Sequence, residues 1–211
     1  MNIRNYDNVF KANSSFQQIH PSMPSDHFTM LICGPPNCGK TNLVLHMLLE
    51  PLLYFDELYI YAKNLHQEKY QYLQKKFEEI SELRNIRNPD RFSTEIIPVS
   101  QLENNDRQRV VIFDDYIFDK NQKIVDNFTQ GRHKNCSTIY LSQSYFDTDG
   151  TIRLLSTRLC LFQFKSTREI NTILREHQVK QEDYSVATAI KHGFLYIDHK
   201  KNKVLKSLED K

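Results

Sequence analysis

Eight residues near the N-terminus constrain this chain most. They read GPPNCGKT over residues 34–41, after an apolar run at 28–33 and before a helical-looking stretch at 41–49. A glycine, four residues and then Gly-Lys-Thr is the spacing of the phosphate-binding P-loop, which joins a buried strand to a helix. The sequence therefore predicts a P-loop fold with a phosphate site where the first strand meets the first helix.

The order of residue types in this loop suits ATP and Mg²⁺. Backbone N–H groups at a helix N-terminus face the phosphates, Lys40 reaches the β and γ oxygens, and the Thr41 hydroxyl meets Mg²⁺. Because Pro35 and Pro36 carry no N–H, the donors must come mainly from residues 37–41. The residues expected to bind the nucleotide are Gly34, Asn37, Cys38, Gly39, Lys40, Thr41 and Asn42.

Composition excludes several classes of protein. With 211 residues, of which 39% are hydrophobic, the chain can bury one substantial core. It has no apolar run long enough to span a membrane and no secretion signal, so we expect a protein that is neither membrane-spanning nor secreted. The four cysteines lack zinc spacing, which is typical of reduced thiols inside cells. A formal net charge of +2 disfavours a monomer that coats nucleic acid.

Apolar runs alternate with helix-length segments along the rest of the chain. Strand-like runs lie at 57–62, 95–99, 110–113, 137–141 and 159–164, helical patterns lie at 66–82, 121–129, 151–156, 167–177 and 180–191, and a hairpin is expected from 194 to 205. This alternation predicts an α/β fold with a mostly parallel central sheet flanked by helices. We assign residues 26–211 to a single P-loop domain and residues 1–25, which lack clear periodicity, to an extended N-terminal arm.

Two adjacent carboxylates, Asp114 and Asp115, end the most apolar of these strands. Parallel strands present their carboxyl ends at one edge of the sheet, so both should lie where the P-loop opens. There Asp114 would hold Mg²⁺, directly or through water, and Asp115 would orient or deprotonate the attacking water. The alternative is a pair that only caps a turn, which a P-loop upstream makes less favourable.

Polar residues flank the next strand on both sides. Gln143 follows it, and would emerge at the nucleotide edge to sense the γ-phosphate or the water if this strand lies beside 110–113; the alternative is an amide that closes a turn. Arg132 precedes it, which suits an arginine finger that reaches a neighbouring subunit's γ-phosphate. Arg153 and Arg158 are rival fingers, and a solvated surface role for Arg132 stays open.

Four segments together carry a family resemblance: GPPNCGKT, VVIFDD, GRHKNCSTIYLSQS and LCLFQF. They resemble the DNA-packaging ATPases of poxviruses, virophages and related double-jelly-roll viruses, a branch of the FtsK-HerA translocases. The resemblance covers roughly residues 26–200, and its most specific part is Arg-His, then a strand, then Ser-Gln. It implies an ASCE-type, RecA-like P-loop core and an ATP-driven ring that threads double-stranded DNA into a preformed capsid.

The resemblance also implies roles for single residues. One departure is Asp115, because cellular translocases usually carry Glu there. Asp is one methylene shorter, so water activation could run through an intervening water. The matched positions are Lys40 and Thr41 for the Walker A pair, Asp114 and Asp115 for the Walker B pair, Gln143 for the glutamine after the fourth core strand, and Arg132 for the trans finger.

The partners implied are double-stranded DNA, copies of the same chain in a ring of about five or six subunits, and a viral capsid or vertex protein. Such a motor would act in the virion or at an assembly site inside the host cell. In a ring each subunit need supply only one or two cations, so the near-neutral charge is compatible with DNA binding. Three alternatives stay open: a cellular or mobile-element translocase or helicase, which shares every core motif; a small-molecule kinase; and a non-catalytic scaffold.

Overall fold

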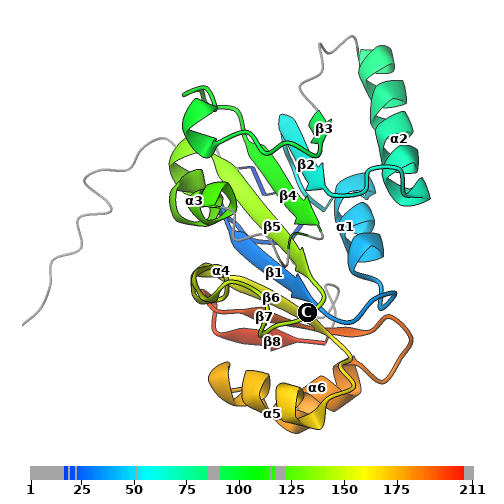
Figure 1. The fold of residues 1–211 in the computed structure, drawn as a ribbon, viewed down its shortest axis with the longest axis vertical. Coiled ribbons are helices and arrows are strands. Elements are labelled where there is room, and N and C mark those ends of the chain that lie inside the picture. Colours follow the sequence, from blue (N-terminus) through cyan, green and yellow to red (C-terminus); the bar gives the residue numbers. More distant parts are fainter. Residues whose placement is uncertain are drawn as a thin grey trace, which may run out of the picture.

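One sheet runs through the centre of the protein (Figure 1). The computed structural model describes residues 17–18, 20–21, 23–50, 52–84, 91–114, 116 and 122–206. Within these ranges, eight strands lie in the order β3-β2-β4-β5-β1-β6-β7-β8. Their bounds are β1 Thr29–Cys33, β2 Glu57–Ala62, β3 Arg91–Ser93, β4 Arg109–Asp114, β5 Cys136–Ser142, β6 Arg158–Phe162, β7 Phe194–Asp198 and β8 Lys203–Leu205.

The strands from β3 to β6 in this order pair in parallel, while β7 and β8 pair antiparallel. The turn between β7 and β8 contains Asn202 at φ 50°, a left-handed conformation that Asn tolerates. The predicted mostly parallel sheet and the C-terminal hairpin are both confirmed. The carboxyl ends of β1, β4 and β5 share one edge, called the carboxyl edge below, and the opposite edge is the amino edge.

Helices cover both faces of the sheet. Their bounds are α1 Lys40–Leu49, α2 Glu68–Arg84, α3 Gln122–Gln130, α4 Gly150–Leu155, α5 Thr167–Glu176 and α6 Gln181–Ala187, with 3-10 turns η1 Val99–Gln101 and η2 Gly131–Lys134. Alternate strand residues point to opposite faces. Thus Ile112 packs in the core beneath α1 and α2, and its neighbours Val111 and Phe113 pack in the core beneath α3 to α6. Figure 1 shows α1 and α2 together on one side of the sheet and α3 on the other.

The strand-like run at 95–99 was wrong as a strand prediction. Ile96 and Val99 are buried as the sequence suggests, but this segment is loop leading into η1, and the edge strand β3 lies earlier, at Arg91–Ser93. The N–H of Ile97 donates to the Tyr61 hydroxyl (3.3 Å), and Pro98 has no N–H to give to a neighbouring strand. Apolar burial in a loop therefore imitated the pattern of a strand.

The last helix before the hairpin is shorter than expected. It ends at Ala187, whereas the pattern extended to 191. The hydroxyl of Thr188 donates back to the carbonyl of Tyr184 (2.8 Å), and the chain then turns through residues 189–193 into β7. This turn brings His192 to the carboxyl edge, beside the P-loop.

Part of the predicted N-terminal arm lies among the described residues. Met23 is buried in the core beneath α1 and α2, and the N–H of Gln17 donates to the side-chain oxygen of Gln108 (3.0 Å). Most of residues 1–25 lies outside the described ranges, so the extended arm and its boundary stay a prediction. Among the described residues, every helix is too short or too polar to cross a lipid bilayer.

Candidate active site

The P-loop connects β1 to α1 at the carboxyl edge, as predicted. Lys40 is almost fully buried, at 8% exposure. Its ammonium group donates to the carbonyl oxygens of Gly34 (2.6 Å) and Pro35 (2.9 Å), so the side chain lies back across the loop. The N–H of Gly34 in turn donates to the carbonyl of Ser142 on β5 (3.1 Å). The two bonds of the ammonium group hold the lysine within the predicted phosphate loop.

The start of α1 presents backbone donors without a side-chain cap. Its N-cap is Gly39, at φ 119°, which has no side chain to cap the first helical N–H groups. Asn37 is also left-handed, at φ 62°. A helix N-terminus with uncapped N–H groups favours an anion. Of the other predicted nucleotide residues, Thr41 is half-buried and Asn42 is exposed, both on the first turn of α1.

Close packing explains why position 34 requires glycine. A Cβ there would lie 2.6 Å from the Cβ of Phe162 and 2.8 Å from the sulfur of Cys38. The P-loop therefore packs directly against Phe162 of β6, and the sulfur of Cys38 lies close to Gly34 as well. Burial raises the pKa of the Cys38 thiol, and the nearby Lys40 ammonium opposes that shift.

Asp114 ends β4 on the same side of the sheet as the P-loop helix. It follows Val110 and Ile112 on the face that α1 and α2 cover. Its partner in the register is Leu141, whose own partner is Ile32 on the P-loop strand. The backbones of Asp114 and Ile32 are therefore two strand spacings apart, which is about 10 Å. The predicted meeting of this carboxylate with the P-loop edge is thus confirmed, whereas Asp115 lies outside the described residues.

A tyrosine holds the Asp114 carboxylate. Tyr70, on the first turn of α2, is 1% exposed, and its hydroxyl donates to Oδ2 of Asp114. The ring of Tyr70 packs in the core beneath α1 and α2, as expected for an apolar position of the helical pattern at 66–82. Nothing in the spacing indicated that its hydroxyl would reach a residue 44 positions away. Sequence reasoning therefore missed this contact.

Gln143 lies at the carboxyl edge and is exposed. It directly follows β5, which pairs with β1 on one side and with β4 on the other. The condition set from the sequence, that this strand lies beside the strand of Asp114, is therefore met. The catalytic role of Gln143 stays a prediction.

Arg132 lies at the amino edge, far from the P-loop of its own chain. It belongs to η2 just before β5, and its side chain is exposed. The seven residues of β5 separate it from Gln143, a span of about 20 Å. This placement prevents Arg132 from serving its own site and leaves it available to a neighbouring molecule.

Arg158 cannot serve as the finger. It is 1% exposed, and its Nε lies 3.0 Å from Oδ2 of Asp198, which is also buried. A buried ion pair of this kind is costly to break, because either partner alone would be an uncompensated buried charge. The structure thus removes one of the two rivals of Arg132.

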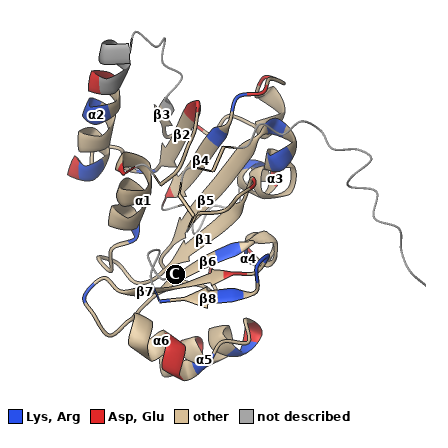
Figure 2. Ribbon diagram, turned by 180° about the vertical axis from the view of Figure 1, so that it is seen from behind, with Lys and Arg blue, Asp and Glu red and all other residues tan. Residues whose placement is uncertain are grey.

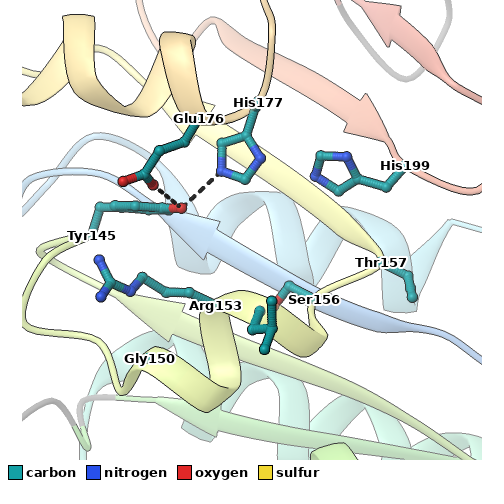
Figure 3. Close-up of a pocket in the computed structure, with 9 residues that line it drawn as sticks. Tyr145, Gly150, Arg153, Ser156, Thr157, Glu176, His177 and His199 are labelled. Carbon is teal, nitrogen blue, oxygen red and sulfur yellow. Dashed lines mark hydrogen bonds between the residues drawn. The ribbon is translucent and has the colours of Figure 1, made fainter.

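Arg153, the other rival, is half-buried against aromatic rings. Its guanidinium lies 5.1 Å from the centroid of the Tyr145 ring and 5.8 Å from that of Phe146. Figure 3 shows it beneath Tyr145 at the side of a cavity of about 520 Å³. Stacking of this kind restrains an arginine side chain, so Arg132 is the freer of the two.

The cavity itself lies toward the amino edge, away from the P-loop. The Tyr145 hydroxyl donates to Glu176 (3.0 Å) and lies 2.8 Å from Nε2 of His177, whose ring faces His199 (Figure 3). Burial and the neighbouring His199 lower the pKa of His177 to about 4, so it is neutral at pH 7. None of these residues except Arg153 was singled out from the sequence, because their spacing follows no motif.

A comparison with family models decides which family the chain belongs to. The family model described as poxvirus A32 protein matches residues 14–210. The chain therefore belongs to the poxvirus A32 protein family. No curated protein matches this A32-family chain in a separate comparison.

Solved structures agree on the fold. The DNA-packaging ATPase B204 from Sulfolobus turreted icosahedral virus is 13% identical, with a TM-score of 0.57, over 85% of this chain and 96% of that one. The genome packaging NTPase B204 from Sulfolobus turreted icosahedral virus 2, in complex with ATP-gammaS, is 12% identical, with a TM-score of 0.55, over 84% and 95%. At such identity the likeness concerns the fold, and it confirms the predicted P-loop NTPase class.

Family membership confirms the resemblance drawn from the sequence motifs. This A32-family chain is a P-loop ATPase of the viral genome-packaging class. The alternative of a cellular or mobile-element translocase or helicase is not favoured. The roles of single residues stay predictions.

Proposed function

We propose that this A32-family ATPase works as a ring of copies of itself that uses Mg²⁺ and ATP to drive double-stranded DNA into a viral capsid. One observation carries the proposal. The buried Lys40 of the P-loop and the Asp114 carboxylate lie at one edge and on one face of the sheet. The B204 proteins, described as genome packaging enzymes, share this fold and support the same use of it.

The residues at this edge fit Mg²⁺. The Thr41 hydroxyl and the Asp114 carboxylate would supply oxygen ligands, which this hard cation prefers. When bound, Mg²⁺ neutralises charge on the transferred phosphoryl group. Lys40 would exchange its bonds to the loop carbonyls for bonds to phosphate oxygens. Asp115 would orient the attacking water, and Gln143 would contact that water or the γ-phosphate.

Tyr70→Phe tests the metal role of Asp114. Without the hydroxyl, the carboxylate loses the bond that orients it, and partners of this kind typically matter about 10-fold to 100-fold for metal affinity or activity. We expect ATP hydrolysis at limiting Mg²⁺ to fall about tenfold and to recover largely at high Mg²⁺. Steady-state hydrolysis over a Mg²⁺ titration measures this.

Tyr72→Phe is the matched control. Tyr72 lies two residues further along α2 and is 52% exposed, so its hydroxyl should not matter. A Tyr70→Phe protein with the wild-type Mg²⁺ dependence would contradict the role of Tyr70 and weaken that of Asp114.

The position of Arg132 supports the proposed ring. A subunit that keeps its finger about 20 Å from its own Gln143 needs a neighbour to complete each site. Head-to-tail contacts of this kind close into rings, here of about five or six subunits. The capsid or vertex protein of the virus would be the docking partner, and the virion or the assembly site in the host cell the place of action.

Double-stranded DNA is the proposed substrate along which the ring moves. Figure 2 shows Lys and Arg on several of the described elements, among them α2 and β8, without one dominant basic helix. In a ring these cations repeat around the pore, so modest charge per subunit suffices. A motor that moves a whole genome must contact the phosphate backbone of the DNA rather than recognise particular bases.

We therefore expect duplex DNA of any sequence to stimulate ATP hydrolysis, and the stimulation to fall steeply with salt. Single strands should stimulate less, because the chain has no tryptophan and no evident aromatic and basic stacking tract. Hydrolysis rates with matched duplex and single-stranded DNA over a salt series measure both. Equal or greater stimulation by single strands would instead support a helicase.

A further inference from the structure

A histidine outside every predicted motif contacts the P-loop. Nδ1 of His192 lies 2.8 Å from the carbonyl oxygen of Cys38. A carbonyl only accepts, so Nδ1 carries the proton and donates. The ring also packs on the next residue, since a Cβ on Gly39 would lie 3.1 Å from Nδ1 and 3.3 Å from Cβ of His192. The imidazole therefore covers the outer side of the Cys38–Gly39 peptide.

The turn that carries His192 is built to hold it there. His192 has φ 65°, in the left-handed region, which is uncommon for residues other than Gly but in which His, like Asn and Asp, is enriched. A Cβ on Gly193 would lie 2.3 Å from the carbonyl of Ala187, so only glycine fits next to it. β7 starts at the following residue, Phe194, whose ring packs on Phe162 beneath the P-loop (centroids 5.4 Å apart). Packing on both sides thus fixes the turn relative to the loop.

The Cys38–Gly39 peptide needs such a restraint. Gly39 adopts positive and negative φ about equally well, so rotation of the peptide before it meets little resistance from sterics. The C=O and the following N–H of a trans peptide point in opposite directions. When the Cys38 carbonyl is held toward His192, the Gly39 N–H must therefore point away from it.

We propose that His192 is a positioning residue, which aims the Gly39 N–H at the phosphates of the bound nucleotide by holding the Cys38 carbonyl outward. The proposal rests on the ATPase function above. A rotated peptide would present a carbonyl to the phosphates instead of a donor. The loss matters more here than in most P-loops, because Pro35 and Pro36 have already removed two donors.

Three variants test this proposal. His192→Ala and His192→Gly remove the donor, and glycine does so without backbone strain. His192→Asn keeps an N–H donor on a short side chain and tolerates positive φ. Gln178→Ala is the matched control, because Gln178 is also exposed and left-handed, at φ 55°, but follows α5 away from the loop.

Titration calorimetry with ADP gives the primary measurement. We expect the Kd for ADP to rise about fivefold to tenfold in His192→Ala and His192→Gly, as loss of one hydrogen bond does. The Kd should stay within about twofold of wild type in His192→Asn and Gln178→Ala. The KM for ATP should follow the Kd while kcat changes little, because the bond to phosphate forms before the chemical step. Thermal unfolding without nucleotide should be cooperative in all variants, which shows that each of them is folded.

The outcomes separate this proposal from the function on which it rests. Wild-type protein that binds no ADP would contradict the ATPase function and the role of His192 together. If wild type binds ADP and both donor-less variants bind it equally well, only the role of His192 is overturned. Weak ADP binding by His192→Asn that matches His192→Ala would also overturn it, because the donor would then not be what matters.

Discussion

An Arg132→Ala ring is expected to bind ATP as tightly as wild type and to hydrolyse it about 10³-fold or more slowly. Arg132 is exposed at the amino edge, and the length of β5 separates it from its own Gln143. Removing it therefore leaves Lys40, Thr41 and Asp114 of the same subunit intact. The neighbour's site loses the cation that stabilises charge on the transferred phosphoryl group. Nucleotide binding and steady-state hydrolysis of the purified ring measure the two effects.

Mixed rings distinguish a finger that acts in trans from a structural defect. Asp115→Asn should keep ATP binding and slow hydrolysis by about 10² or more in its own subunit. Rings that combine Arg132→Ala and Asp115→Asn subunits should recover activity at interfaces where an intact finger meets an intact site. His133→Ala, an exposed neighbour on η2, is the control and should behave as wild type.

No recovery in rings shown to be mixed, together with full loss in Arg153→Ala, would move the finger to Arg153. Arg158→Ala is uninformative here, because it breaks a buried ion pair with Asp198 and should impair folding.

Local patterns predicted most of the fold and the nucleotide edge. The strand at 57–62 matches β2 residue for residue, and the P-loop, Asp114 and Gln143 all lie at the carboxyl edge. These predictions succeeded because the P-loop spacing, the apolar strand and the parallel topology each fix the direction in which the chain leaves the sheet. Each of them depends on residues that are neighbours in sequence.

Contacts between distant residues could not be predicted. Arg158 was a candidate finger because the sequence does not show that Asp198 lies opposite it across the β6–β7 pair. Tyr70 and His192 reach the site from 44 and 154 positions away from their partners. Such pairings arise when whole helices and strands pack together, and the periodicity of the sequence does not indicate them.

Lys40→Ala is expected to abolish turnover, by about 10³-fold or more, and to weaken ATP binding. The Lys40 ammonium is the buried cation of the P-loop, and it is held by the carbonyls of Gly34 and Pro35. Without it, the β and γ oxygens lose the cation that binds them. Lys180→Ala, an exposed lysine before α6, is the control for loss of one positive charge. ATP binding by Lys40→Ala at wild-type affinity with ordinary turnover would contradict the assigned P-loop geometry.

Movement along duplex DNA is the most direct test of a packaging motor. A third strand bound in the major groove of a duplex reports it, because a translocase that follows the duplex displaces that strand without separating the other two. Wild-type rings with Mg²⁺ and ATP should release the third strand, leave a forked duplex paired, and lose both ATP hydrolysis and release in Lys40→Ala. Separation of the forked duplex without release of the third strand, or equal release by wild type and Lys40→Ala, would contradict an ATP-driven double-stranded DNA motor.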